Sequence, residues 1–432
     1  MKRTCTRERA VAYVYGIMNA AAAASYEKHA AHCEQCSAHI AAIASIKDIA
    51  SLGARTLSRT VPPLKDAPSI RISYVPRALA AAAAVLIIIT GGVLLSLRTP
   101  RPTVISKGAV QPAPAGMPAK SWCFATKGAL RTTPTVDGNA VFFGSDDARV
   151  YALAPESGSL LWEYRTAGRI ASVPIIVGNA LYAASADGYV YCLDKKNGLL
   201  TWKRAVGTII FSQLCADKSG VFAATAEGLV VALANDGKQR WQKSLGTPVM
   251  SALVGDERAI FFGTRDGVVY ALAKNDGSPL WGHITESHFL TSRPRIAGDL
   301  VVMGDTDGMV YAIDRARGTL AWRFKTGGAV IADIESREGL IYVASDKVYC
   351  VSESGREVWR FAPDTSIDVN CIISPTALTI VDKYNSFYHL HPKSGICMRR
   401  ETRTSPVLGF AYAGSTLFTA GDDGSLCAVN DK

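Results

Sequence analysis

The strongest constraint on the fold of this chain is the even spacing of its tryptophans. All seven lie in the C-terminal part of the 432-residue sequence, at intervals of 40, 40, 39, 40, 41 and 37 residues. They are Trp122, Trp162, Trp202, Trp241, Trp281, Trp322 and Trp359. Self-similarity at a fixed period of roughly 20 to 50 residues is the signature of a repeat architecture. Residues 121–432 are therefore predicted to form one array of similar units.

A second marker, an apolar strand that reads V-Y-A-L or close to it, occurs eight times. The copies begin at Val150, Val190, Val230, Val269, Val310, Val348, Phe387 and Leu426. Asp-Gly or Glu-Gly precedes most copies, as in SADGYVYCL at 185–193, and a second glycine turn precedes the next tryptophan. With short strands such as SVPIIVG at 172–178, each unit contains four strands. Four-stranded units in radial repetition predict an all-β propeller.

The two ends of the repeat region explain why eight strand markers accompany only seven tryptophans. The last copy reaches Lys432 before a fourth strand, and SWCFAT at 121–126 has no blade in front of it. We expect this segment to complete the last blade and close the ring, which leaves no long open sheet edge. In the seventh copy the tryptophan position holds Met398 or Arg399. The sequence thus predicts eight blades, with seven as the alternative.

One apolar run precedes the repeats. Residues 78–97 contain no charged side chain and form a helix about 30 Å long, the thickness of a hydrocarbon core. We predict a single transmembrane helix here, with a buried globular helix as the alternative. Residues 51–77 are predicted to be a basic linker that contacts anionic lipid, and residues 98–120, with five prolines, a semi-extended linker.

The net charge of +10 is confined to the residues before the repeats. Residues 122–432 hold 32 basic and 32 acidic residues, whereas residues 1–77 hold 11 and 5. The repeat region therefore lacks the positive surface that phosphate binding requires. We expect no direct contact of this chain with nucleic acid.

A candidate metal site lies in the first forty residues. His29, Cys33 and Cys36 form an H-x3-C-x2-C pattern, and Cys5 lies upstream. Four such ligands are the set that structural Zn²⁺ takes, and positions i and i+4 share one face of a helix. Residues 1–50 are therefore predicted to form a small all-α module stapled by zinc. Reduced thiols without metal, a C-x-x-C redox pair, and His32 or His39 as the fourth ligand are the alternatives.

This N-terminal segment resembles the zinc-binding anti-sigma domain. The resemblance rests on AYVYGIM at 12–18 and YEKHAAHCEQC at 26–36. In that family the module wraps around an extracytoplasmic-function sigma factor and blocks its docking on RNA polymerase. The resemblance implies the same role for residues 1–50, with Cys5, His29, Cys33 and Cys36 as zinc ligands.

The chemistry of thiols orients the chain across the membrane. Zinc thiolates persist in reducing solvent, so the N-terminal module is expected in the cytoplasm and the repeat region outside it. The chain is thus predicted to be a single-pass protein of the inner membrane. The charges that flank the apolar run are nearly balanced and add little to this argument.

The repeat region resembles the PQQ-like, or quinoprotein-type, propellers over about 310 residues. The repeated D/E-G-x-V-Y-A-L and x-G-x-x-x-W elements carry the resemblance. It implies either a catalytic dehydrogenase or a non-catalytic scaffold such as the outer-membrane barrel-assembly lipoprotein. Such dehydrogenases have two adjacent cysteines under the cofactor, and this sequence has no such pair. We therefore expect no bound PQQ and no catalysis.

Several chemically active side chains of the repeat region have structural interpretations. The tryptophans are expected to pack between blades, and Asp146, Asp187, Asp266 and Asp307 to form turns. His389 and His391 are expected on one face of a strand, where a metal pair is the alternative to packing. The seven cysteines of this region are odd in number, so at least one is unpaired within a monomer. Cys192 and Cys350 occupy equivalent positions in different units, which excludes a bridge between them.

Together these features predict a membrane-anchored anti-sigma regulator. Its zinc module would sequester a sigma factor, and its propeller would receive a signal or dock an unidentified extracytoplasmic protein or ligand. The alternative is an envelope scaffold in which the N-terminal module is only an anchor. An enzyme with a quinone cofactor is the third hypothesis.

Overall fold

The computed structural model describes residues 110–112, 121–170, 172–207, 213–286, 290, 292–367, 371–403 and 407–430. Every regular element among these residues is a β-strand. The predicted zinc module (1–50), the linker 51–77 and the helix 78–97 lie outside them. No helix able to cross a membrane is found within the described ranges.

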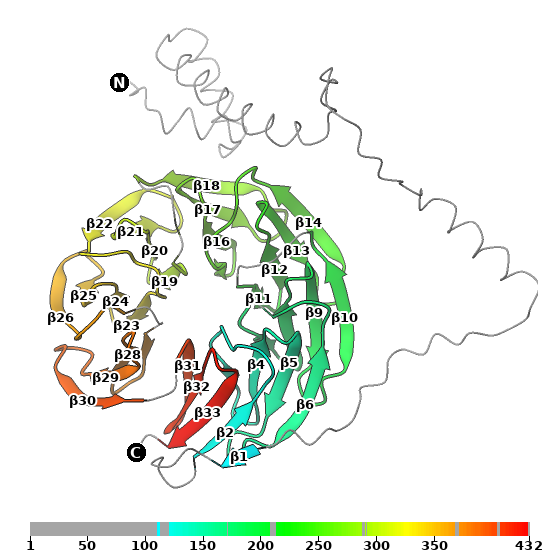
Figure 1. Ribbon diagram of the computed structural model, residues 1–432. Helices are drawn as coiled ribbons and strands as arrows, with labels where there is room; N and C mark the ends of the chain where they lie inside the picture. The colour runs from blue at the N-terminus through cyan, green and yellow to red at the C-terminus, as the bar shows by residue number, and fades with distance from the viewer. Residues whose placement is uncertain are drawn as a thin grey trace, which may run out of the picture. The chain divides into compact units, whose positions relative to one another are not determined.

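The strands form eight antiparallel sheets that follow one another around a ring (Figure 1). In each sheet the first strand of the unit lies nearest the centre of the ring and the last lies outermost. The first four sheets consist of β3 (Thr135–Val136), β4 (Val141–Ser145), β5 (Arg149–Leu153) and β6 (Leu160–Arg165); β7 (Ile175–Val177), β8 (Ala180–Ala184), β9 (Tyr189–Asp194) and β10 (Leu200–Ala205); β11 (Cys215–Asp217), β12 (Gly220–Ala224), β13 (Leu229–Leu233) and β14 (Gln239–Ser244); and β15 (Val254–Gly255), β16 (Ala259–Gly263), β17 (Val268–Ala273) and β18 (Pro279–Ile284).

The other four sheets continue the same order, which confirms the predicted four-stranded unit and its eight copies. They consist of β19 (Arg295–Ala297), β20 (Leu300–Gly304), β21 (Met309–Asp314) and β22 (Leu320–Lys325); β23 (Glu335–Arg337), β24 (Leu340–Ala344), β25 (Val348–Ser352) and β26 (Glu357–Phe361); β27 (Ile372–Ile373), β28 (Leu378–Val381), β29 (Ser386–Leu390) and β30 (Cys397–Thr402); and β31 (Gly409–Ala413), β32 (Thr416–Ala420), β33 (Ser425–Asn430), β2 (Trp122–Ala125) and β1 (Val110–Pro112). We number these sheets as blades 1 to 8.

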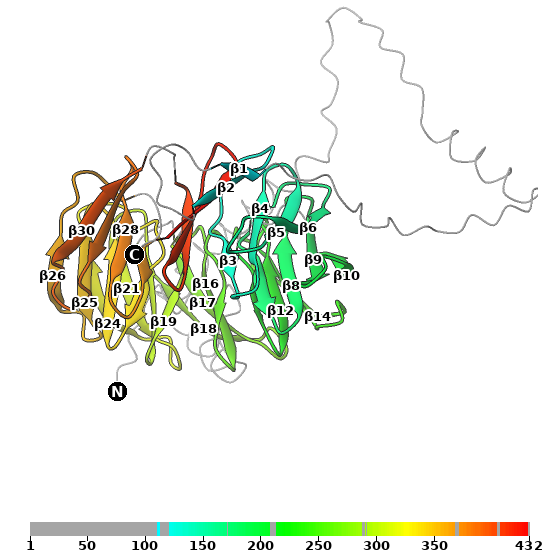
Figure 2. The ribbon, with the colours of Figure 1, turned by 90° about the horizontal axis from the view of Figure 1, so that it is seen from below.

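Blade 8 joins the two ends of the repeat region, as the sequence predicts. Strand β2 pairs with β33, and the two lie side by side in both views (Figures 1 and 2). Cys123 lies opposite Cys427 in this pairing, and the two form a disulfide across 304 positions of sequence. Strand β1, from the predicted linker 98–120, adds a fifth strand outside β2. The ring is therefore closed by main-chain hydrogen bonds and by one covalent bond.

The seven tryptophans pack between neighbouring blades, as predicted. Each indole N–H donates a hydrogen bond to a main-chain carbonyl of the following blade, and a glycine of that blade lies against the ring face. For Trp241 the acceptor is Lys274 at 2.9 Å and the glycine is Gly277, which has a φ of +72°. The other acceptors are Pro155, Lys195, Asn235, Arg315, Glu353 and Pro392. This contact repeats at seven of the eight interfaces.

The interface between blades 7 and 8 departs from this pattern. Arg399 pairs with His389 at the ladder position where Trp162 pairs with Ala152 in blade 1, so it is Arg399 that occupies the tryptophan position. The buried apolar cluster of this interface has five residues, whereas the other seven clusters have nine to thirteen. Among the described residues, this interface has the smallest apolar core of the ring.

Candidate functional site

The four predicted zinc ligands, Cys5, His29, Cys33 and Cys36, lie outside the described residues. Within the described ranges, no group of three or more His, Cys, Asp or Glu side chains could hold a metal ion. The site features that the structure does describe belong to the propeller.

Three of the four predicted turn aspartates, Asp146, Asp187 and Asp266, have the structural role that the sequence predicts. Asp187 accepts hydrogen bonds from the Tyr191 hydroxyl at 2.6 Å and from the Ala167 amide at 3.1 Å. It therefore ties its own turn to the connection that follows the preceding blade. Burial and the hydrogen bond to Asp187 raise the pKa of Tyr191. The Asp146 carboxylate accepts from Arg131 Nε at 2.7 Å and that of Asp266 from the Thr264 hydroxyl at 2.6 Å, so these three carboxylates are engaged by the protein itself.

The prediction that His389 and His391 share a strand face is wrong. Strand β29 ends at Leu390, so His391 falls in the following turn and is exposed, where its Nδ1 lies 3.1 Å from the Ser394 hydroxyl. His389 is only 6% exposed, and its Nδ1 lies 3.2 Å from the Thr379 hydroxyl. The structure does not bring the two imidazoles together on one surface.

Five of the seven cysteines of the propeller are free. Cys192, Cys350 and Cys371 are buried, Cys215 is half-buried and Cys397 is exposed. Cys192 and Cys350 are unpaired, as their equivalent positions predict. Burial raises the pKa of the Cys192 thiol to about 11 and that of the Cys350 thiol to about 12. These two thiols therefore remain protonated and unreactive near neutral pH.

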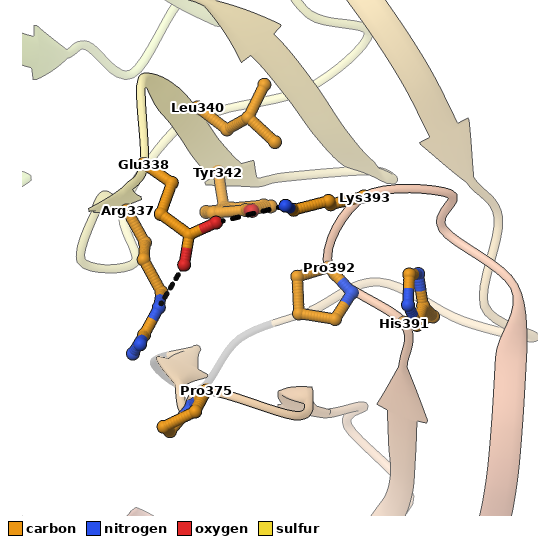
Figure 3. A pocket seen from close by; sticks show the side chains of 8 residues that line it. All are labelled: Arg337, Glu338, Leu340, Tyr342, Pro375, His391, Pro392 and Lys393. Carbon is orange, nitrogen blue, oxygen red and sulfur yellow. Dashed lines mark hydrogen bonds and ion pairs between the residues drawn. The ribbon is translucent and has the colours of Figure 1, made fainter.

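A pocket of about 330 Å³ opens between blades 6 and 7 (Figure 3). The end of β23 and the turn after it, strand β24, and two turns of blade 7 supply its walls. It is lined by Arg337, Glu338, Leu340, Tyr342, Pro375, His391, Pro392 and Lys393.

The charged side chains of this pocket form one chain of ion pairs. The Glu338 carboxylate lies between Arg337 Nε, at 3.3 Å, and Lys393 Nζ, at 3.1 Å (Figure 3). Hydrogen bonds from Lys393 and Arg337 lower the pKa of Glu338. Beside them Tyr342 is almost fully buried, and burial raises its pKa to about 12. The pocket thus combines a charged rim with an apolar wall.

The residue that accepts the indole hydrogen bond at this interface differs from its counterparts at three others. At three other interfaces, the residue whose carbonyl accepts the indole hydrogen bond is basic, and its side chain reaches an acidic turn of the preceding blade. These pairs are Lys195 with Asp137 at 2.8 Å, Lys274 with Asp217, and Arg315 with Asp256 at 3.5 Å. Pro392 keeps the carbonyl, 2.9 Å from Trp359 Nε1, but has no basic side chain. Pro155, Asn235 and Glu353 likewise place no basic side chain at this position of three further interfaces.

The opposite wall is also unusual. Glu338 has a φ of +51°, in the left-handed region, and begins the two-residue turn between β23 and β24. The equivalent turns of blades 2, 5 and 8 have Gly178, Gly298 and Gly414 there, with φ between +56° and +61°. Glycine adopts this conformation without strain, whereas a residue with a side chain does not. Glu338 thus stands where three other blades have glycine.

The ion pair of Lys274 with Asp217 gives a test of these repeated interblade contacts, because Lys274 is the most buried of the three basic residues. Lys274 is 4% exposed and bonds to Asp217 and to the Asp256 carbonyl. Partial burial raises the pKa of Asp217, but hydrogen bonds from Lys274 and Ser219 outweigh it, so the net shift is downward. We expect Asp217→Asn to lower the free energy of unfolding by about 2 kcal/mol because it leaves a buried cation.

Urea unfolding at pH 7 measures this loss, with Asp236→Asn as the control. Asp236 pairs with Lys238 on the surface, where both side chains are more than half exposed, so its loss should not change stability. Because the pKa of Asp217 is lowered on folding, its contribution is present above its ordinary pKa and disappears as the pH falls through the folded value. Equal effects of the two variants would contradict the role of the buried ion pair.

A second charged cluster lies on the inner strands of blades 5 and 6. Arg295 lies 3.2 Å from Glu335, and Arg293 lies 3.9 Å from Asp333. Burial raises the pKa of Glu335 and of Asp333, and the two arginines only partly offset it. The Cys371 thiol donates to the Asp333 carbonyl at 3.3 Å, so three blades meet at this cluster.

The raised pKa of Glu335 predicts how stability depends on pH. Because the folded state keeps the proton to a higher pH than the unfolded state, stability falls as the pH rises above the ordinary value of 4.5. We expect Glu335→Gln to flatten this fall, measured by urea unfolding between pH 4 and pH 7. Parallel pH profiles for the two proteins would contradict the prediction.

Sequence reasoning missed the disulfide and the pocket. The disulfide had a signal: Cys123 lies in the segment expected to close the ring, and Cys427 in the strand expected beside it. The pocket had a weaker signal, since Glu338 stands in place of a turn glycine only when the blades are aligned strand by strand. The charged cluster of Arg295 and Glu335 had no signal in the sequence, because the two residues are 40 positions apart and meet only when their blades are adjacent.

Comparison with known proteins places the chain in a family. The family model described as outer membrane protein assembly factor BamB matches residues 118–211, 207–329 and 265–402. These overlapping matches cover most of the propeller and more than half of the chain. The chain belongs to this BamB family. No curated protein matches the sequence.

The BamB-family propeller is also similar to solved structures. BamB from Moraxella catarrhalis is 15% identical, with a TM-score of 0.63, and the match covers 71% of this chain and 98% of that one. The computationally designed Ika8 protein is 16% identical with a TM-score of 0.65, covering 71% and 97%. A europium-containing methanol dehydrogenase is 13% identical with a TM-score of 0.61, covering 69% and 85%. At these identities the likeness shows the fold alone.

Proposed function

We propose that this chain is a non-catalytic membrane-anchored regulator. Residues 1–50 bind zinc through Cys5, His29, Cys33 and Cys36 and sequester an extracytoplasmic-function sigma factor. Residues 78–97 cross the inner membrane, and the propeller receives a signal or docks a protein outside the cytoplasm. The H-x3-C-x2-C motif, followed by the apolar run and the propeller, carries this proposal.

The disulfide supports the proposed orientation of the chain. Cross-strand disulfides such as Cys123–Cys427 persist in oxidising compartments, whereas zinc thiolates require reduced cysteines. A propeller outside the cytoplasm and a zinc module inside it satisfy both conditions. The absence of adjacent cysteines in the sequence supports a propeller without PQQ and without enzymatic activity.

Co-purification of the full chain from membranes tests the regulatory role. We expect a sigma factor to be recovered with the native chain and lost with Cys33→Ser combined with Cys36→Ser. The matched control is Cys397→Ser, which changes an exposed free cysteine of the propeller. Recovery of no sigma factor, or equal recovery with both variants, would refute the proposal. Reporters fused at Met1 and Lys432 should lie on opposite sides of the membrane.

The second candidate is an envelope scaffold, which the match to an outer membrane assembly factor family favours. In this function the propeller recruits envelope partners and the N-terminal module serves only as an anchor. Replacing residues 1–50 by an unrelated soluble domain discriminates the two. The regulator loses control of sigma-dependent transcription, whereas the scaffold keeps its function.

A further inference from the structure

We propose that the pocket between blades 6 and 7 binds a carboxylate carried on an apolar body, such as a peptide chain that ends in an apolar residue. The proposal deepens the docking role of the propeller and rests on that part of the proposed function, but it is independent of the sigma factor. The positive φ of Glu338 and the ion pairs that this residue makes with two cations draw attention to this pocket.

The pocket offers hydrogen-bond donors that the protein itself does not use. Among the described residues, Arg337 engages Glu338 only through Nε, which leaves Nη1 and Nη2 without a protein acceptor. Lys393 bonds only to Glu338, and His391 uses only Nδ1. A planar carboxylate matches the two parallel donors of a guanidinium better than a spherical anion does.

The charge of the pocket favours a ligand with one negative charge. Arg337 and Lys393 contribute two positive charges and Glu338 one negative charge, so the formal sum of these three side chains is +1. Glu338 also holds the two cations in place, because each of them pairs with one of its oxygens. A cationic ligand would have to displace these ion pairs, whereas an anion adds to them.

The remaining walls suit an apolar group of side-chain size. Leu340, Tyr342, Pro375 and Pro392 lie around the opening (Figure 3), and Tyr342 and Pro392 are buried. The pocket is small and partly open to solvent, which favours one amino-acid-sized group over a large cofactor. The ligand class is therefore an amphipathic monocarboxylate.

The conformation of Glu338 supports a binding role rather than a packing role. The equivalent turns of blades 2, 5 and 8 use glycine, so glutamate at φ +51° costs stability that its exposed ion pairs recover only in part. Strained positions of this kind cluster at binding sites. Here the strained residue is the one that orients both cations of the pocket.

Calorimetric titration of the full-length chain with N-acetyl-L-leucine tests the proposal. The control ligand is N-acetyl-L-leucinamide, which has the same body without the charge. We expect the acid to bind at least about tenfold more tightly than the amide. A pentapeptide with a C-terminal leucine carboxylate separates the two sources of such a ligand: tighter binding than the single amino acid indicates a partner peptide, and equal binding a small molecule. Equal binding of acid and amide, or binding of neither, would overturn the proposal.

Two variants test the pocket itself. Pro392→Lys supplies the amine found at three other interfaces, which should pair with Glu338, fill the pocket and abolish binding without lowering the melting temperature. Arg337→Gln should weaken binding about tenfold. Arg317→Gln, at a surface arginine that is 77% exposed, should not change it. Unchanged affinity in Pro392→Lys would overturn the proposal, whereas recovery of the sigma factor should be the same in all three variants.

Discussion

Replacing Cys123 and Cys427 together by alanine is expected to lower the free energy of unfolding of the propeller by about 4 kcal/mol. The disulfide joins positions 304 residues apart, and a cross-link that closes so long a loop removes much conformational freedom from the unfolded chain. Both sulfurs are buried between β2 and β33, so alanine leaves no unsatisfied polar group. At about 2 °C per kcal/mol for a domain of this size, the melting temperature should fall by about 8 °C.

Reductant provides an independent measurement of the same bond. Dithiothreitol should lower the melting temperature of the native propeller to that of the double variant, and should not change the variant further. Cys397→Ser is the matched control, because Cys397 is exposed and free. A melting temperature that is the same with and without reductant would show that the bond does not stabilise the ring.

Gly277→Ala is expected to lower the free energy of unfolding by about 3 kcal/mol. A Cβ at this position would lie 2.6 Å from the indole of Trp241, so the interface has to move apart, which typically costs 1 to 3 kcal/mol, about 2 kcal/mol here. The φ of +72° adds roughly 1 kcal/mol for any residue with a side chain. Chemical denaturation measures the sum.

Gly178→Ala separates the two contributions. Gly178 also has a positive φ, but nothing lies within 4 Å of a Cβ added there. It should therefore cost only about 1 kcal/mol, the conformational part. If both variants lost the same stability, the indole contact would not be a significant part of the interface.

The fold was predictable because the repeat encodes each blade locally. The Asp-Gly turn, the V-Y-A-L strand and the tryptophan recur at a fixed distance, so strand number and blade number follow from counting. Closure by β2 was predictable from the same count, since one strand was missing at the end and one was in excess at the beginning. Eight blades are confirmed on this basis.

The features that escaped prediction depend on which blades are neighbours in space. The pocket involves Glu338 and Pro392, 54 positions apart, and neither residue is unusual by itself. The pairing of His389 with Arg399 depends on the bulge at Met398, between Cys397 and Arg399, that shifts the register of β30 by one residue. His391 was misplaced for a simpler reason. Strand β29 ends at Leu390, one residue earlier than expected, so His391 does not share the alternation of side chains along the strand.

The zinc ligands and the membrane helix stay predictions. They rest on side-chain chemistry in Cys5, His29, Cys33 and Cys36 and on the apolar run 78–97, both read from the sequence. Zinc content of the purified full-length chain and of its Cys33→Ser variant would test the zinc ligands. Reporter fusions at the two ends of the chain would test the membrane helix.

The position of the disulfide bears on how the ring responds to mechanical load. A pull on the chain before Val110 acts first on the pairing of β1 with β2 and then on β2 itself. Without the disulfide, the tension would break the hydrogen bonds between β2 and β33 one after another and open the ring. With Cys123 joined to Cys427, the force passes directly to β33, so the ring stays closed when the chain is pulled from the residues before Val110.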